Sequence, residues 1–99
     1  MTIERHVYIK LNADHATDRG RTEVVERTRT LATIPGVRSC EVGVAADANA
    51  LTAWDVTIRL TFDSIDAVEP YREHPVHRSY LEEFLKPRLS VLKAWNFDM

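Results

Sequence analysis

The 99-residue sequence has little cysteine, glycine and proline, and no long apolar run. Its single cysteine, Cys40, cannot form a disulfide within the chain, which fits a reducing compartment, and we expect a cytoplasmic protein. No apolar stretch approaches the roughly 20 residues that span a bilayer. The first residues also lack the apolar segment of a signal peptide. We therefore expect neither a membrane partner nor secretion.

The sequence also lacks a large excess of charge of either sign, because it has 13 Lys and Arg residues and 15 Asp and Glu residues. No basic stripe is present to release counterions from a phosphate backbone, so nucleic acid is not an expected partner. Glycine-rich phosphate loops, nucleophile elbows and Cys-x-x-Cys pairs are absent too. The length and the balanced composition fit a single domain over residues 1–99.

The sequence does contain clear periodicity. Four segments alternate apolar and polar residues in the manner of half-buried strands. They span residues 5–11, 37–44, 54–62 and 91–97. The third segment has its large apolar side chains on one face, namely Trp54, Val56, Ile58, Leu60 and Phe62. That face must be buried.

Two regions with helical spacing separate these strands. The first runs over residues 18–33, with Thr17 or Asp18 as its cap, and ends at a turn built on proline and glycine. The second begins after residue 64 and is broken at Pro75, because proline excludes His74 from helical geometry and suits the first turn of a new helix. Residues 45–50 show no periodicity and are predicted to form a hairpin loop.

The element order β-α-β-β-α-α-β predicts an α+β fold, a ferredoxin-like sandwich whose four-stranded antiparallel sheet has helices on one face. The other face would carry Tyr8, Trp95 and Phe97, together with the charges of Asp55 and Arg59. Such a face is too apolar for solvent. We expect a homodimer that buries it and pairs the charges across the seam.

Several segments stand in an order that is met in a known family. They are Arg5 to Leu11, Ile34-Pro35-Gly36-Val37, Glu41-Val42-Gly43, Trp54 to Phe62, and Tyr71-Arg72-Glu73-His74-Pro75-Val76-His77. With these segments the chain resembles the stress-responsive α/β barrel family, known as Dabb. The resemblance implies a homodimer whose two sheets form a barrel. It implies no single activity, since many family members have none assigned.

The best-understood enzyme of that family is a plant polyketide cyclase, which closes a ring by cofactor-free acid-base chemistry between sheet and helices. The resemblance implies that Tyr71 matches its pocket tyrosine and His77 its catalytic histidine. Val56 stands where the cyclase has another pocket histidine, and an isopropyl group transfers no proton. Arg5 stands at the position of its strand-one histidine, with His6 on the opposite face unless one residue is looped out.

Three functions stay open. The first is binding of an apolar or aromatic small molecule between sheet and helices, and the second is a cofactor-free enzyme in which His77 transfers a proton and Tyr71 orients a carbonyl or phenol. The third is a structural stress protein, with His77 bracing the corner. A cavity below roughly 100 Å³ beside His77 would exclude the first two. The predicted lining is Val56, Ile58, Tyr71, His77, Tyr80 and Phe84.

Neither a cofactor nor a metal ion is expected. His74 and His77 are close in the sequence, but only Glu73 stands beside them as a further ligand. His74 is predicted to cap or pack at the bend instead.

Overall fold

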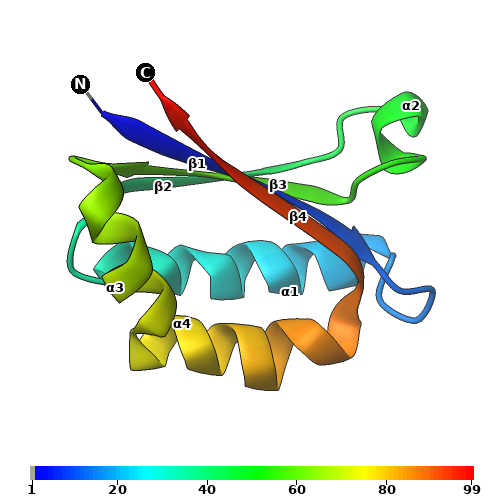
Figure 1. Cartoon of the computed structure of the whole chain (residues 1–99). Coiled ribbons are helices and arrows are strands. Elements are labelled where there is room, and N and C mark those ends of the chain that lie inside the picture. Colours follow the sequence, from blue (N-terminus) through cyan, green and yellow to red (C-terminus); the bar gives the residue numbers. More distant parts are fainter. Residues whose placement is uncertain (1) are drawn as a thin grey trace.

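The computed structural model describes residues 2–99, which form a four-stranded antiparallel sheet with helices on one face (Figure 1). The strand order is β2-β3-β1-β4. The strands are β1 (Ile3–Leu11), β2 (Val37–Val44), β3 (Val56–Phe62) and β4 (Leu89–Asp98). The predicted α+β, ferredoxin-like order of elements is confirmed, and β2 has the bounds that its alternation predicted.

The helices lie below the sheet in Figure 1, except for one short helix at the end of the β2-β3 hairpin. They are α1 (Asp18–Thr28), α2 (Ala48–Leu51), α3 (Val68–Glu73) and α4 (Pro75–Ser79). α1 continues as a 3-10 turn over Arg29–Thr33, and α4 continues as a π-helical segment over Tyr80–Leu85. Over residues 2–99 no helix has the length and apolar character needed to cross a membrane.

Local capping explains where two of these helices begin. The Thr17 hydroxyl accepts from the Gly20 amide at 3.0 Å, which confirms Thr17 as the cap of α1. Residues 45–50 were predicted to form a hairpin loop. The prediction is wrong from Ala48 onward, because Ala48–Leu51 forms the short helix α2. The Asp47 carboxylate accepts from the Ala50 amide at 2.8 Å and so starts a single helical turn, which is too short to show periodicity.

The bend at Pro75 has the predicted geometry. His74 is extended, with φ −63° and ψ 139°, and Pro75 opens α4. The His74 Nδ1 accepts from the Val76 amide at 3.1 Å, which confirms His74 as a capping residue. Pro70 lies in the first turn of α3, where its missing N–H leaves no gap in the hydrogen bonding.

The helix-covered face of the sheet holds the core. In the register of the central strand, Val7 lies opposite Ile58 on one side and Ala94 on the other, so these residues point to the same face. Every second residue of β1 and β3 is therefore placed under the helices. The buried strand residues are Val7, Ile9, Leu11, Val56, Ile58, Leu60 and Phe62.

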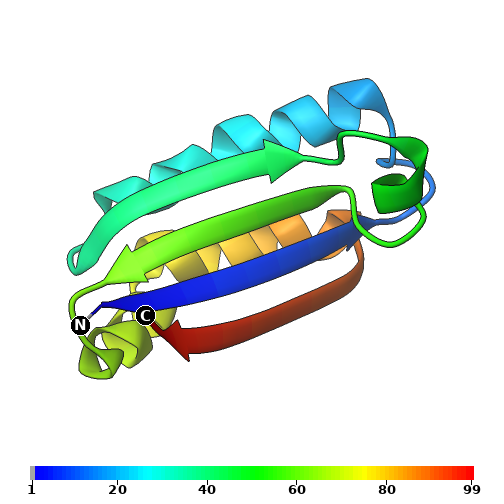
Figure 2. The ribbon, with the colours of Figure 1, turned by 90° about the horizontal axis from the view of Figure 1, so that it is seen from above.

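No helix covers the opposite face, which Figure 2 shows from above; we call it the open face. Trp95 and Phe97 are 50% and 46% exposed. Tyr8 lies with its ring centroid 6.1 Å from that of Trp95, and His6 lies 4.9 Å from Phe97. The aromatic open face is as predicted, and it places His6 away from the helices.

The faces of two residues just before β3 were predicted wrongly. Trp54 was expected on the buried face, but its ring lies 5.6 Å from that of Tyr8 on the open face. Asp55 was expected on the open face but is only 1% exposed, and its carboxylate accepts from Arg21 Nη1 at 3.0 Å. The reason is that β3 begins only at Val56. The chain bends just before it, so the alternation does not extend to these residues.

The charge of Arg59 is also satisfied within one chain. Arg59 does lie on the open face, but its Nη2 donates to Glu41 Oε1 at 2.8 Å, and the two residues are cross-strand neighbours in β3 and β2. The predicted pairing of Arg59 with Asp55 across a dimer seam is therefore wrong. Asp55 is instead bound by α1 of its own chain.

Candidate functional site

A cavity of about 380 Å³ lies between the helix-covered face of the sheet and the helical region that runs from α3 to the π-helical segment. Its volume is within the range of small-molecule sites and well above the roughly 100 Å³ that a filled core would leave. Strands β1, β3 and β4 form its floor, while α3, α4 and the π-helical segment form its wall. The apolar lining consists of Val7, Leu31, Ile58, Leu81, Leu85, Leu92 and Ala94.

The bend at Pro75 brings Tyr71 and His77 together at one end of this cavity. On a continuous helix, side chains six positions apart would lie about 120° apart around the axis. Because α3 stops at Glu73 and α4 starts in a new direction, the two rings instead lie 4.7 Å apart, tilted by 53°. Tyr71 packs edge-on against Phe62, at 5.2 Å, which holds its ring in place.

The hydrogen bonding of His77 determines which ring nitrogen is basic. Nδ1 lies 2.9 Å from the backbone carbonyl oxygen of Arg72, which only accepts, so Nδ1 carries the proton. In the neutral ring the lone pair is then on Nε2. Burial lowers the pKa of His77, and the positive charges of Arg5, Arg72 and Arg78 lower it further, although the Arg72 carbonyl opposes this. His77 is therefore a neutral proton acceptor at pH 7.

The two tyrosines of the cavity differ in what their hydroxyls do. Thr28 Oγ1 donates to the Val24 carbonyl at 2.6 Å, so the Tyr80 hydroxyl must donate to Thr28 Oγ1, at 2.7 Å. The Tyr71 hydroxyl has no hydrogen-bond partner among residues 2–99. Burial raises the pKa of Tyr71, so this hydroxyl stays protonated and can donate to a ligand.

Arg5 also lines the cavity; it was not among the predicted lining residues, although the resemblance placed it at the position of the cyclase's strand-one histidine. Its Nη1 donates to Asn96 Oδ1 at 3.0 Å, on the neighbouring strand β4. Burial lowers the pKa of the guanidinium. The strand period could have identified it, since Arg5 shares a face with the buried residues Val7 and Ile9. The cavity thus combines a cation, a phenol and an imidazole with apolar walls.

The sequence of the chain matches the model of a known protein family over nearly its whole length. The Stress responsive A/B Barrel Domain, Dabb, matches residues 3–98. The chain belongs to this family. No curated protein matches its sequence.

Solved structures show the same fold. A dimeric ferredoxin-like protein of unknown function from Thermobifida fusca is 25% identical, with a TM-score of 0.82, over 100% of this chain and 92% of that one. A Dabb family protein from Mesorhizobium loti is 18% identical, with a TM-score of 0.79, over 99% and 96%. Hydroxynitrile lyase from Passiflora edulis is 13% identical, with a TM-score of 0.81, over 99% and 93%.

The structure of this Dabb chain brings together four of the six predicted lining residues, namely Ile58, Tyr71, His77 and Tyr80. Val56 and Phe84 lie outside the cavity. Val56 is buried in the core at the start of β3, opposite Ile9. Phe84 lies between two guanidinium groups, 5.2 Å from that of Arg27 and 4.1 Å from that of Arg88.

A change in helix type explains the position of Phe84. The prediction assumed α-helical spacing, in which residues four apart share a face. The segment Tyr80–Leu85 is π-helical, so its two buried residues, Tyr80 and Leu85, are five apart. Phe84 is thereby turned out of the cavity toward Arg27 and Arg88.

His74 contributes a cap rather than a ligand. Its Nδ1 is occupied by the Val76 amide, and its neighbour Glu73 is exposed. Within the part of the chain that the structure describes, no three His, Cys, Asp or Glu residues are grouped so as to hold a metal ion.

Proposed function

We propose that this Dabb chain forms a homodimer and binds an apolar or aromatic small molecule in the cavity between sheet and helices. The observation that carries the proposal is the cavity itself, about 380 Å³ with apolar walls. A purely structural protein would fill this space with side chains, because protein interiors are close-packed. The Tyr71 hydroxyl supplies a free donor that fixes a ligand's orientation.

The dimer is supported by the open face and by a relative. The exposed rings of Trp95 and Phe97 form, with Tyr8, an aromatic surface that a second copy would cover. The related Thermobifida fusca protein is described as dimeric. Size-exclusion chromatography with light scattering at micromolar concentration should give twice the chain mass. A monomeric mass would contradict this part of the proposal.

A second candidate function is acid-base catalysis without a cofactor. It is favoured by the neutral His77, whose Nδ1 is held by the Arg72 carbonyl and whose Nε2 remains free to take a proton. The Tyr71 ring lies beside it. The fold is compatible with catalysis, since the Passiflora edulis protein of the same fold is a lyase. The chemistry differs from that of the polyketide cyclase, because Val56 replaces an imidazole and is buried in the core.

Binding is tested by a thermal-shift screen with phenols, polyketides and fatty acids, followed by native mass spectrometry of the hits. A ligand at 100 times its Kd should stabilise the protein by about 2.7 kcal/mol. Ala94→Phe fills part of the cavity and should abolish the shift. Phe84→Leu alters the same helical layer outside the cavity and should leave the shift intact. If no compound binds to the wild type, or if the Ala94→Phe variant binds as well, the cavity is not a ligand site.

Catalysis is tested on the bound compound with His77→Ala, by following its conversion by NMR. Loss of conversion with retained binding would support proton transfer by His77. The matched control is His74→Asn, which removes the other imidazole of the corner while keeping a good helix cap. Unchanged conversion in the His77→Ala variant would rule out the catalytic role, and weaker binding alone would make His77 an anchor.

A further inference from the structure

Arg5 is an unusual residue for the floor of an apolar cavity. It lies on β1 between Leu60 of β3 and Asn96 of β4, on the face that the helices cover. Its only hydrogen bond within residues 2–99 goes to the neutral amide oxygen of Asn96, and no carboxylate of that part of the chain forms an ion pair with it. A partly buried cation normally has a charged partner. Among the described residues no carboxylate contacts Arg5, although Glu69 is near enough to act on its charge.

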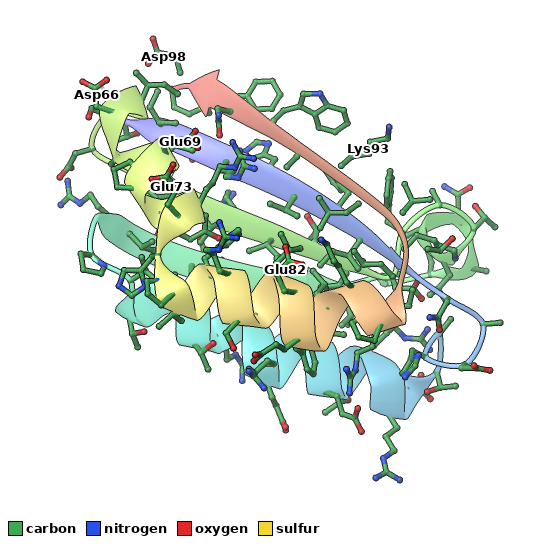
Figure 3. All side chains as sticks on the ribbon, turned by 60° about the horizontal axis from the view of Figure 1, so that its bottom comes forward. Asp66, Glu69, Glu73, Glu82, Lys93 and Asp98 are labelled. Atoms are coloured by element: carbon green, nitrogen blue, oxygen red, sulfur yellow. The ribbon has the colours of Figure 1, made fainter. Side chains whose placement is uncertain are left out.

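The charges at the mouth of the cavity do not supply this partner. Three carboxylates lie where the helices face β4 (Figure 3), namely Glu69, Glu73 and Glu82. Arg72 Nη1 lies 3.3 Å from Glu69 Oε2, and Lys86 Nζ lies 2.8 Å from Glu82 Oε2, so two of the three are neutralised locally. Arg78 also lines the mouth. Among residues 2–99, none of these three carboxylates forms an ion pair with Arg5 on the floor of the cavity.

The neighbours of Arg5 fit a carboxylate. A guanidinium offers parallel N–H groups that match two carboxylate oxygens, and the bond from Nη1 to Asn96 holds its plane while leaving other N–H groups free. Tyr71 lines the same cavity and offers a protonated hydroxyl as a further donor. Beyond these polar groups the walls are apolar, with Leu31, Ile58 and Leu85. A ligand that uses all of this surface has one charged end and one apolar end.

We propose that the cavity binds an organic acid with a single carboxylate and an apolar or aromatic body, and that Arg5 selects the carboxylate. The inference rests on the proposed function, because it names the chemical class of the ligand of the same cavity. A single carboxylate matches the single guanidinium on the floor of the cavity. A second carboxylate would meet the acidic side chains of the mouth, namely Glu69, Glu73 and Glu82 (Figure 3).

The test compares two probes of nearly equal shape, 1-naphthoate and 1-naphthamide, by isothermal titration calorimetry at pH 7.5 in 150 mM salt. The wild type should bind the carboxylate at least about tenfold more tightly than the amide, since hydrogen bonds to charged groups are stronger. Arg5→Met keeps the apolar stem and loses the charge, and it should bind the two probes within about twofold of each other.

Arg38→Met is the matched control, because Arg38 is also an arginine paired with a carboxylate, Asp63, but lies outside the cavity lining. It should keep most of the preference for the carboxylate. Circular dichroism establishes that each variant is folded, and Arg5→Lys replaces Arg5→Met if the latter does not fold. Arg5→Lys keeps the charge but loses the planar fork of the guanidinium. Its preference for the carboxylate probe over the amide should therefore be weaker than that of the wild type but stronger than that of a variant with an uncharged residue.

The outcomes separate this inference from the proposed function. Equal binding of both probes by the wild type would overturn selection by Arg5 but leave the cavity as a ligand site. An undiminished preference in the Arg5→Met variant would also overturn it, and would assign the selection to another cation. If neither naphthyl probe nor any compound of the thermal-shift screen binds, both proposals fall.

Discussion

The two faces of the sheet are built from the same strands but differ in what lies against them. On the covered face, Val7 and Leu60 are buried by helices of the same chain, and their neighbour Arg5 lines a cavity. On the open face, Trp95 and Phe97 remain about half exposed. The covered face therefore has its partner within the chain, whereas the open face has none there among residues 2–99. In the proposed function, ligand binding depends on the first face and association on the second.

The ion pairs of the two faces show the same difference. Asp55 is 1% exposed and is bound by Arg21 of α1, whose side chain is 15% exposed. Arg59 and Glu41 on the open face pair at 2.8 Å, with both side chains more than half exposed. A buried pair leaves an uncompensated charge when one partner is removed, while an exposed pair is screened by water. Substitutions on the two faces should thus change different quantities.

The largest effect is expected at the buried pair. In the wild type the Leu11 amide donates to Asp55 Oδ2 at 2.8 Å, and Asp55→Asn keeps an oxygen acceptor for this amide. The substitution removes the buried negative charge that pairs with the Arg21 guanidinium. We expect the free energy of unfolding in urea to fall by about 3 kcal/mol.

The control uses the other carboxylate bound by the same arginine. Asp18 lies 2.9 Å from Arg21 Nη2 and is fully exposed, so Asp18→Asn should reduce the free energy of unfolding by less than about 1 kcal/mol. Similar losses in the Asp55→Asn and Asp18→Asn variants would contradict the distinction between the buried and the exposed pair.

A smaller effect on stability and a clear effect on association are expected for the open face. Trp95→Glu introduces a charge into the aromatic surface and should weaken the dimer by about 2 kcal/mol or more, as for a central interface tryptophan. Light scattering over a dilution series measures the change. Thr22→Glu adds the same charge on the exposed side of α1 and should leave the dimer intact. A dimer that tolerates Trp95→Glu would show that this surface is not the interface.

The smallest effect is the pH dependence that arises from His77. Because burial lowers the pKa of folded His77, the unfolded chain binds the proton more readily, at its ordinary value of about 6.5. The stabilisation is complete above that pH and is lost as the pH falls from about 6.5 toward the lower, folded pKa. His77→Gln should remove this part of the pH dependence of the unfolding free energy.

An NMR titration of the imidazole nitrogens measures the same property directly. It should give a pKa for His77 below 6.5, with the proton of the neutral ring on Nδ1, where the Arg72 carbonyl accepts it. A pKa at or above 6.5, or a neutral ring protonated on Nε2, would remove the basis for His77 as a proton acceptor.

Prediction from sequence succeeded where the cause is local. Alternation predicted β2 over residues 37–44, and the hydroxyl of Thr17 predicted the start of α1. Gly36 has φ +93°, as its place in the turn indicated, because glycine has no Cβ to oppose positive φ. Pro75 predicted the break between α3 and α4. Each of these features depends on the backbone geometry of a few neighbouring residues.

Prediction failed where the cause is a partner far away in the sequence. Asp55 lies in an alternating pattern, but the chain bends just before β3, and the Asp55 carboxylate is bound by Arg21 on α1. Phe84 lies in a helical stripe, but the π-helical turn points it out of the cavity, where Arg27 of α1 lies 5.2 Å from its ring. No period of the sequence contains these contacts, because they join residues of different elements.

By itself, the sequence determined the order of the strands and helices and the corner at Pro75, since these follow from backbone preferences and side-chain period, and its motifs carried the resemblance to the Dabb family. Only the tertiary structure decided what the corner does. It placed Tyr71 beside His77, held His77 Nδ1 on the Arg72 carbonyl, and brought Arg5 into the same cavity from a distant strand. The distances and the burial that set the protonation of these groups arise only when the helices pack on the sheet.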